Sequence, residues 1–169
     1  MRNPGSFNQA GPPAGKAAAR WLALAERILR CHRMFREELA RHAERSQLTE
    51  PEFLLLWACR RAPPRGVAQS QLAARLAVSA AQVSGLVERL RRGGLLEGRR
   101  GPSDRRRQFW RLTPAGEATL QAGLAGMADW AGAFDSRLGA RGARRLIRLL
   151  DRLVRPRMSQ GDAGQRGAA

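Results

Sequence analysis

The sequence contains no tyrosine, two cysteines, two histidines and only one lysine, Lys16. Cys31 and Cys59 are too few for the disulfide framework of a small secreted domain. The cysteines and histidines also lack a recognisable ligand spacing, so no metal site and no other cofactor is expected. Because no run of about 18 apolar residues and no signal-peptide core occur, the sequence predicts a cytoplasmic protein without a membrane span.

Acidic residues are scarce as well, with 14 Asp and Glu against 31 Lys and Arg, which gives a net charge of +17. The chain shows neither a nucleophile beside a base nor a phosphate-binding glycine loop, so an enzyme is not expected. A strongly basic surface favours a polyanionic partner, chiefly nucleic acid. Since an arginine-rich composition can also arise from a GC-rich coding sequence, the position of the charge is more informative than its total.

The chain of 169 residues is long enough for one compact domain with tails. Residues 1–16 and 158–169 are rich in small and polar residues and are predicted to be disordered tails. Residues 17–47 form an N-terminal region with one long helix, 17–45, in which Ala25, Ile28, His32, Phe35 and Leu39 recur at helical spacing. At about 1.5 Å per residue this helix is longer than a small globule needs, so it is expected to pack beyond its own domain.

Residues 48–112 carry the clearest local signals. Thr49 and Glu52 form a capping box at the start of a helix that runs to about Ala62, before two prolines, and a short helix is expected at 69–76. Ser79 and Gln82 form a second capping box before a helix over 80–92, whose apolar stripe comprises Val83, Leu86, Val87 and Leu90.

Two strands, 95–100 and 105–112, follow around a turn at 101–104. In the second strand, Trp110 and Leu112 are expected to anchor the hairpin while the arginines project from it. Thr113 then caps a helix with Pro114 at its first position, and this helix is expected to continue to Phe134. A last helix is predicted at about 141–155, so residues 113–157 form a C-terminal helical region.

The basic charge is concentrated in the middle of the chain. Residues 60–111 contain 13 arginines and three acidic residues, a net +10. Compositional bias would have spread this charge evenly. Short helices, a tight turn, an amphipathic helix and a basic hairpin together predict a mostly α fold with a small β-wing, which is a winged helix-turn-helix DNA-binding domain flanked by long helices.

Three segments resemble the MarR family of bacterial transcriptional regulators. They are LTEPEFLLLWA, SQLAARLAVSAAQVSGLVERLRRGGLL and SDRRRQFWRLTPAG, and they lie within residues 48–120. Asp104-x-Arg106 before Leu112-Thr113-x-x-Gly116 is similar to the family's wing motif. The resemblance implies a homodimer that joins through the outer helices and places one helix in the major groove and one wing at the minor groove. It also implies a regulator, commonly a repressor, that binds a palindromic operator and releases it when a small anionic or aromatic effector binds.

The candidate DNA-binding residues lie on the exposed face of the 80–92 helix and on the 95–112 wing. They are Ser79, Ala80, Ala81, Gln82, Ser84, Arg89, Arg92, Asp104, Arg105, Arg106 and Arg107. Gln82 can pair bidentately with adenine, or it only caps the helix. The arginines at 89, 91 and 92 bind phosphates, or are solvated charges paired to Glu88.

Two further interpretations concern the wing and the helix face. Asp104 holds Arg106 in a fixed direction and leaves its neighbours free for the DNA, or it merely favours the turn. Many relatives carry arginine where this chain has Gly85, so less direct base readout and more dependence on groove shape are expected.

The effector site is predicted with less support from the residues. His32 is a satisfied core or interface histidine, or it lies with Phe35 and Trp57 in the cleft where relatives bind ligands. Cys31 beside His32 suggests redox sensing. However, peroxide-sensing relatives place their cysteine at the position of Ala25, and this chain has no tyrosine to support a thiolate. The alternatives to a ligand-responsive regulator are therefore an architectural, non-specific nucleic-acid binder and a thiol or peroxide sensor on the same fold.

Overall fold

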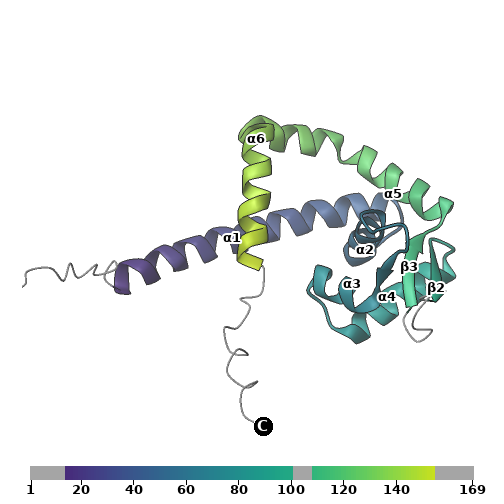
Figure 1. The fold of residues 1–169 in the computed structure, drawn as a ribbon. Coiled ribbons are helices and arrows are strands. Elements are labelled where there is room, and N and C mark those ends of the chain that lie inside the picture. The colour runs from purple at the N-terminus through teal and green to yellow at the C-terminus, as the bar shows by residue number, and fades with distance from the viewer. Residues whose placement is uncertain (1–13, 101–107, 155–169) are drawn as a thin grey trace, which may run out of the picture. The chain divides into compact units, whose positions relative to one another are not determined.

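The computed structural model describes residues 14–100 and 108–154, in one unit that ends at Gly126 and a second that begins at Met127 (Figure 1). The helices of the first unit are α1 (Ala14–Arg45), α2 (Glu50–Arg60), α3 (Gln69–Leu76), α4 (Ala80–Arg92) and α5 (Pro114–Gly126). Its strands are β1 (Val67–Ala68), β2 (Leu96–Arg100) and β3 (Gln108–Leu112), and the second unit contains α6 (Ala128–Val154). This confirms the predicted class, a winged helix-turn-helix with long outer helices.

Helix α2 begins at the predicted cap. The backbone N–H and the hydroxyl of Thr49 both donate to the Glu52 carboxylate, at 2.9 and 2.7 Å. Leu48 and Phe53, at the two positions of a hydrophobic staple, are buried. The helix ends at Arg60, two residues earlier than predicted.

The α3–turn–α4 segment forms the helix-turn-helix. Both helices have the predicted bounds, and Ala77 turns the chain between them in a left-handed conformation with φ of 54°. The predicted stripe of α4 is the face turned into the core, and all four of its members, Val83, Leu86, Val87 and Leu90, are buried. Because one side of α4 is committed to the core, its opposite side is available to solvent.

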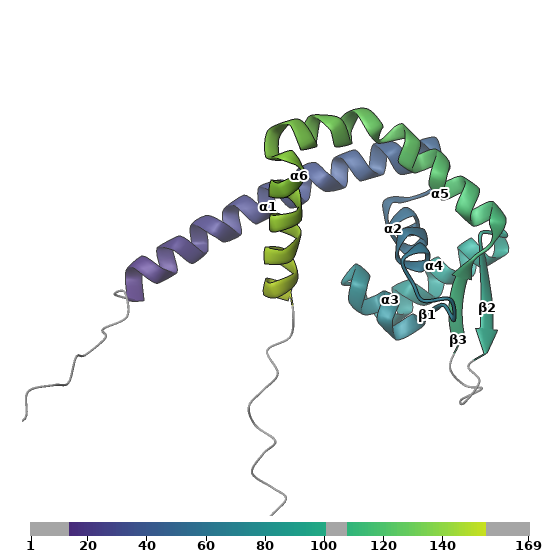
Figure 2. The same cartoon turned by 45° about the horizontal axis from the view of Figure 1, so that its top comes forward.

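The strands form an antiparallel sheet in the order β1-β3-β2, which Figure 2 shows beside α4. The pairing of β2 and β3 runs from Leu96↔Leu112 to Arg100↔Gln108. Trp110 is buried and anchors the hairpin as predicted. Strand β1 was not predicted, because two residues are too few to show an alternating pattern.

Helix α1 differs in burial between its two ends. Ala43 and His42, near its C-terminal end, are buried, and this end packs on α2 and α5. The N-terminal part carries exposed apolar side chains, namely Trp21, Leu22, Leu24, Ile28, Leu29 and Met34. Exposed apolar surface on this scale is typical of an interaction surface.

The prediction of a single helix from Pro114 to Phe134 was wrong. Helix α5 ends at Gly126, and α6 begins at Ala128 and continues to Val154. The apolar repeat runs across Met127 without a change of period, so it gives no signal of the break. Helix α6 is itself interrupted at Gly139, with φ of 65° and ψ of 159°, which accounts for the separate last helix expected from about residue 141.

The second half of α6 presents a solvent-exposed apolar face. Its members are Leu146, Ile147, Leu149, Leu150, Leu153 and Val154. Arg148 and Arg152 lie on the opposite side of the same helix, because the positions differ by half a turn. Such an amphipathic helix with its apolar face in water lacks a packing partner within its own unit.

The start of α5 is packed directly against the turn that follows α4. Thr113 donates its N–H to the Leu95 carbonyl at 3.1 Å and its hydroxyl to the Gly94 carbonyl at 2.6 Å. It also caps α5 by accepting the Gly116 N–H at 3.0 Å. A Cβ atom at Gly116 would lie 2.1 Å from the Leu95 carbonyl oxygen. Glycine is therefore required at this position by a backbone-to-backbone contact.

We expect Gly116→Ala to lower the free energy of unfolding by about 2 kcal/mol or more, because neither backbone can retreat without losing the Thr113–Leu95 hydrogen bond. The matched control is Gly85→Ala in α4, where the added Cβ meets only the Arg89 guanidinium at an ordinary 3.7 Å. That control should stabilise the helix by about 0.5–1 kcal/mol. Urea unfolding of the two variants measures the difference, and equal stabilities would contradict the packing argument.

Candidate nucleic-acid interface

The exposed face of α4 carries the candidate DNA-binding residues. In the structure the side chains of Ser79, Ala80, Ala81, Gln82, Ser84, Arg89 and Arg92 are all exposed. The buried stripe faces the core, so these residues lie on the exposed side and the flanks of α4. The segment with Asp104, Arg105, Arg106 and Arg107 lies outside the described residues, between the paired ends of β2 and β3 at Arg100 and Gln108.

Gln82 caps the helix on which it stands. Its backbone N–H donates to the Ser79 hydroxyl at 3.2 Å, and its side-chain Oε1 accepts both the Ser79 N–H and the Ser79 hydroxyl at 3.0 Å. The capping box predicted from the sequence is complete. The capping role is therefore confirmed, and a base contact by Gln82 remains a prediction.

Ser84 is held by a residue that sequence reasoning did not select. Gln69, at the start of α3, donates its Nε2 to the Ser84 hydroxyl at 2.6 Å, and that hydroxyl donates to the Ala80 carbonyl at 2.9 Å. The two helices of the helix-turn-helix are thus joined on their exposed side. Residues 69 and 84 are far apart in the sequence, so no local pattern could have paired them.

Arg91 and Arg92 both bind Glu88. Arg91 approaches the carboxylate with Nε and Nη2 at 2.9 Å, and Arg92 with Nε at 2.8 Å. The hydrogen bonds from Arg91 and then Arg92 lower the pKa of the Glu88 carboxyl to about 2, so it is ionised at neutral pH. The alternative of pairing with Glu88 is confirmed for Arg91 and Arg92 and is wrong for Arg89, which bonds to Glu52, and phosphate binding by all three remains a prediction.

Arg89 makes a different kind of contact, since it reaches across to α2. Its Nε lies 2.8 Å from Oε1 of Glu52, whose carboxylate also receives the two Thr49 hydrogen bonds. Glu52 is 8% exposed. Burial alone would raise the pKa of its carboxyl, but the hydrogen bonds from the Thr49 backbone, Arg89 and the Thr49 hydroxyl hold that pKa below its ordinary value. Glu52 therefore joins the cap of α2 to the candidate recognition helix.

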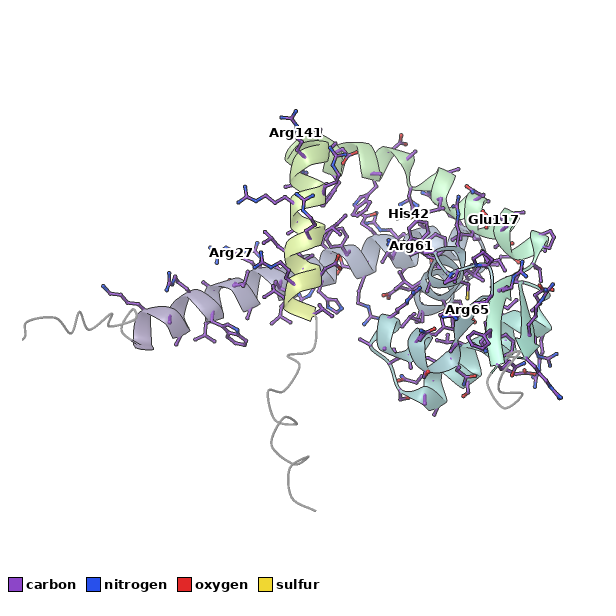
Figure 3. The ribbon with its side chains drawn as sticks, viewed as in Figure 1. Arg27, His42, Arg61, Arg65, Glu117 and Arg141 are labelled. Carbon is purple, nitrogen blue, oxygen red and sulfur yellow. The ribbon has the colours of Figure 1, made fainter. Side chains whose placement is uncertain are left out.

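A second group of arginines lies at and just beyond the C-terminal end of α2, outside the candidate DNA-binding set. The guanidinium groups of Arg60 and Arg61 lie 5.9 and 5.8 Å from the Trp57 ring centroid, and Arg65 lies 5.9 Å from that of Phe109. Figure 3 labels Arg61 at the end of α2 and Arg65 beside the sheet. These distances are within the range of cation–π attraction.

The predicted effector residues differ in their surroundings. His32 is exposed, Phe35 is half-buried and Trp57 is 37% exposed. His32 is therefore not a core residue of the single chain, and its place at an interface remains a prediction. The buried histidine is His42, which continues the same apolar stripe by one step beyond Leu39 and could have been found from that spacing. Among the described residues His42 Nδ1 has no hydrogen-bond partner, and Nε2 lies 3.9 Å from Glu38.

The two cysteines are free thiols in different environments. Cys59 is buried, and burial raises the pKa of its thiol to about 12 although the nearby charge of Arg75 acts in the opposite direction. Such a thiol is protonated at neutral pH and is a poor nucleophile. Cys31 is exposed on α1, in a shallow groove lined by Arg27, Arg30 and Met34.

Neither a metal site nor a membrane span is found in the part of the chain that the structure describes. Within residues 14–100 and 108–154, His, Cys, Asp and Glu side chains nowhere gather in threes as metal ligands do. Over the same residues no helix is both long and apolar enough to cross a bilayer.

Comparison with known proteins agrees with this geometry. Residues 46–107 match the family model described as MarR family. A probable transcriptional regulator from Pseudomonas aeruginosa is 31% identical, with a TM-score of 0.58, and the match covers 75% of this chain and 93% of that one. The chain belongs to the MarR family of transcriptional regulators.

Two other MarR-fold structures were solved with bound molecules. A MarR-family regulator from Streptomyces coelicolor in complex with DNA is 22% identical, with a TM-score of 0.64, and the match covers 86% of this chain and 90% of that one. CouR from Rhodococcus jostii bound to p-coumaroyl-CoA is 20% identical, with a TM-score of 0.70 and coverage of 79% and 92%. A search of curated protein sequences found no match.

We expect Glu52→Gln to cost about 2 kcal/mol at pH 7, because the amide can still accept from Thr49 but cannot pair with the charge of Arg89. The pKa of Glu52 is lowered in the folded protein, so its contribution is fully present above the ordinary value of 4.5 and is lost as the pH falls through the folded value. The difference between wild type and variant should therefore shrink on acidification.

Urea unfolding at pH 7 and at about pH 3.5 measures this change. Glu44→Gln, at an exposed position of α1, removes the same charge and controls for the general effect of charge on stability. A difference between wild type and Glu52→Gln that is the same at both pH values would show that the ion pair with Arg89 does not contribute.

Proposed function

We propose that this MarR-family protein is a sequence-specific DNA-binding regulator that acts as a homodimer on a palindromic operator. The observation that carries the proposal is the two-sided construction of α4, with four apolar residues buried on one side and the candidate contacts exposed on the other. In this arrangement α4 enters the major groove, and Ser79, Ala80, Ala81, Gln82, Ser84, Arg89 and Arg92 contact the DNA. The relative from Streptomyces coelicolor, which was solved with DNA, supports the proposal.

The wing of residues 95–112 is proposed to contact the minor groove beside α4. Its described strands carry Arg99, Arg100 and Arg111, and its connecting segment contributes Arg105, Arg106 and Arg107 with the single acidic residue Asp104. Contacts from these arginines to DNA phosphates would position the protein on the duplex without reading its base sequence.

Dimerisation is proposed through the exposed apolar faces of α1 and α6. Both helices are amphipathic, and their apolar faces are exposed to solvent in the single chain. Two-fold contacts are the commonest way in which identical chains cover such faces. A two-fold dimer would present two copies of α4 to the two halves of a palindrome.

Regulation is proposed to be repression that is relieved by a small anionic or aromatic effector. CouR, the relative solved with p-coumaroyl-CoA, binds a ligand of this kind. His32, Phe35 and Trp57 are the proposed contacts for the effector. The raised pKa of the buried Cys59 thiol speaks against that residue as the basis of a peroxide sensor.

Dimerisation and specific binding are tested together. We expect the protein to sediment at about twice its chain mass of 18.6 kDa and to protect a two-fold symmetric site in the presence of excess competitor DNA. Leu150→Glu places a charge on the apolar face of α6 and should weaken both properties, whereas Arg148→Glu on the opposite side should leave the dimer intact. Protection that disappears with competitor would favour an architectural binder, and a monomer with full specificity would contradict the dimer.

The wing is tested by whether one substitution weakens or tightens DNA binding. We propose that Asp104 orients Arg106 by a charge-assisted bond, and we therefore expect Asp104→Ala to weaken DNA binding moderately although it makes the wing more positive. Arg106→Ala should weaken binding to all sequences and make the log–log salt dependence of the dimer shallower by roughly 2. Titrations at several salt concentrations measure both effects. Tighter specific binding by Asp104→Ala would show that the wing acts as a simple patch of charge.

A further inference from the structure

The Gln82 side chain has a fixed orientation that restricts which bases it can contact. Its Oε1 accepts two hydrogen bonds from Ser79, one from the N–H and one from the hydroxyl. The assignment of oxygen and nitrogen follows from chemistry, because a backbone N–H can only donate. The hydroxyl in turn accepts the Gln82 N–H, so its own hydrogen is directed to Oε1. Both lone pairs of the amide oxygen are thus used within the cap.

The amide nitrogen of Gln82 remains available. Nε2 carries two N–H donors, the residue is exposed, and its hydrogen bonds within the described part of the chain all run through Oε1 and the backbone N–H. Toward solvent, this glutamine therefore presents donors only. A bidentate pair with adenine needs the amide to accept from N6 as well as donate to N7, so it would require the cap to open.

The neighbouring side chains do not supply a competing donor. The Ser84 hydroxyl gives its one hydrogen to the Ala80 carbonyl and accepts from Gln69. Ala80, Ala81 and Gly85 carry no polar side-chain group. In the first two turns of α4, Gln82 Nε2 is thus the side-chain donor that can reach a base edge without breaking an existing hydrogen bond.

We propose that Gln82 selects a keto base, guanine through O6 or thymine through O4, at one position of each half-site. This inference rests on the proposed function, since it requires α4 to lie in the major groove. Guanine presents two acceptors to Nε2, O6 and N7, and thymine presents O4. Adenine presents one acceptor, N7, beside an amino donor, and cytosine presents an amino donor alone, so a side chain that only donates favours the keto bases. The helix cap and the base preference are then two consequences of one side-chain orientation.

The test is selection of bound DNA from a random library by wild type, Gln82→Ala and Gln82→Glu. In the alignment of selected sequences, wild type should prefer guanine or thymine at one position (one column) of each half-site, by about fivefold over the amino bases. The identity of the base in that column distinguishes the two keto sources. Gln82→Ala should lose the preference in that column and keep the others.

Gln82→Glu is the decisive variant. A carboxylate can accept both hydrogen bonds from Ser79, so the cap and the melting temperature should be preserved, but the side chain no longer carries a donor. The second carboxylate oxygen accepts, and the column should change toward cytosine or adenine. Because selection reports relative preference, the general weakening of DNA binding by the added negative charge does not obscure this change.

The outcomes separate the two levels of the proposal. A wild-type column that depends on Gln82 but prefers adenine or cytosine would overturn the keto reading. So would a set of columns unchanged in both variants, which would leave Gln82 as a cap alone while sequence-specific binding stands. Failure of wild type to select any motif would overturn the proposed function itself, and the keto reading with it.

Discussion

The buried carboxylate of Glu52 is the contact on which the arrangement of the DNA-binding unit depends most. One oxygen receives the N–H and hydroxyl of Thr49 and so begins α2, while the other receives Nε of Arg89 and so holds α4. A buried charge is tolerated only when its hydrogen bonds are satisfied, and removing one partner leaves the other uncompensated. The start of α2 and the direction of α4 are therefore coupled through a single side chain, in addition to the apolar contacts between the two helices.

The coupling gives Arg89 a role that differs from that of its neighbours. Arg91 and Arg92 share Glu88 on the exposed surface, where water competes for every hydrogen bond. The phosphates of a bound duplex could replace Glu88 as their partner at little cost to the fold. Arg89 could not leave Glu52 so easily, because the buried carboxylate would lose its charged partner. Arg89 contacts Glu52 through Nε, so the DNA contact proposed for Arg89 would come from the rest of its exposed guanidinium group, whereas Arg91 and Arg92 would exchange Glu88 for phosphate.

Much of the local structure could be predicted from short-range patterns. The stripe of α4 and the capping box at Ser79 both depend on residues within a few positions of one another. The missed features depend on long-range contacts or on segments too short for a pattern. Glu52 and Arg89 are 37 residues apart, and β1 has two residues.

The helix boundary at Met127 shows a different limit. The apolar period continues from Leu120 through Phe134, so the sequence contains the pattern of one helix while the chain forms two. Periodicity reports which face is apolar, and it does not report whether the backbone is continuous beneath that face. Within the candidate site, the Ser79–Gln82 cap was predicted from the sequence, whereas the contacts between helices, Gln69 with Ser84 and Glu52 with Arg89, were not.

Under the proposed function, those internal hydrogen bonds would link the stability of α4 to its selectivity for bases. An N-terminal cap supplies acceptors for backbone donors that would otherwise lack partners. In α4 the acceptor is taken from Gln82, a side chain that stands where base edges would be read, so the cap uses the oxygen and leaves the nitrogen. A recognition helix capped by serine or aspartate alone would keep both functions of a glutamine available. Because the cap of α4 uses the amide oxygen of Gln82, this side chain would offer hydrogen-bond donors but no acceptor to a bound DNA.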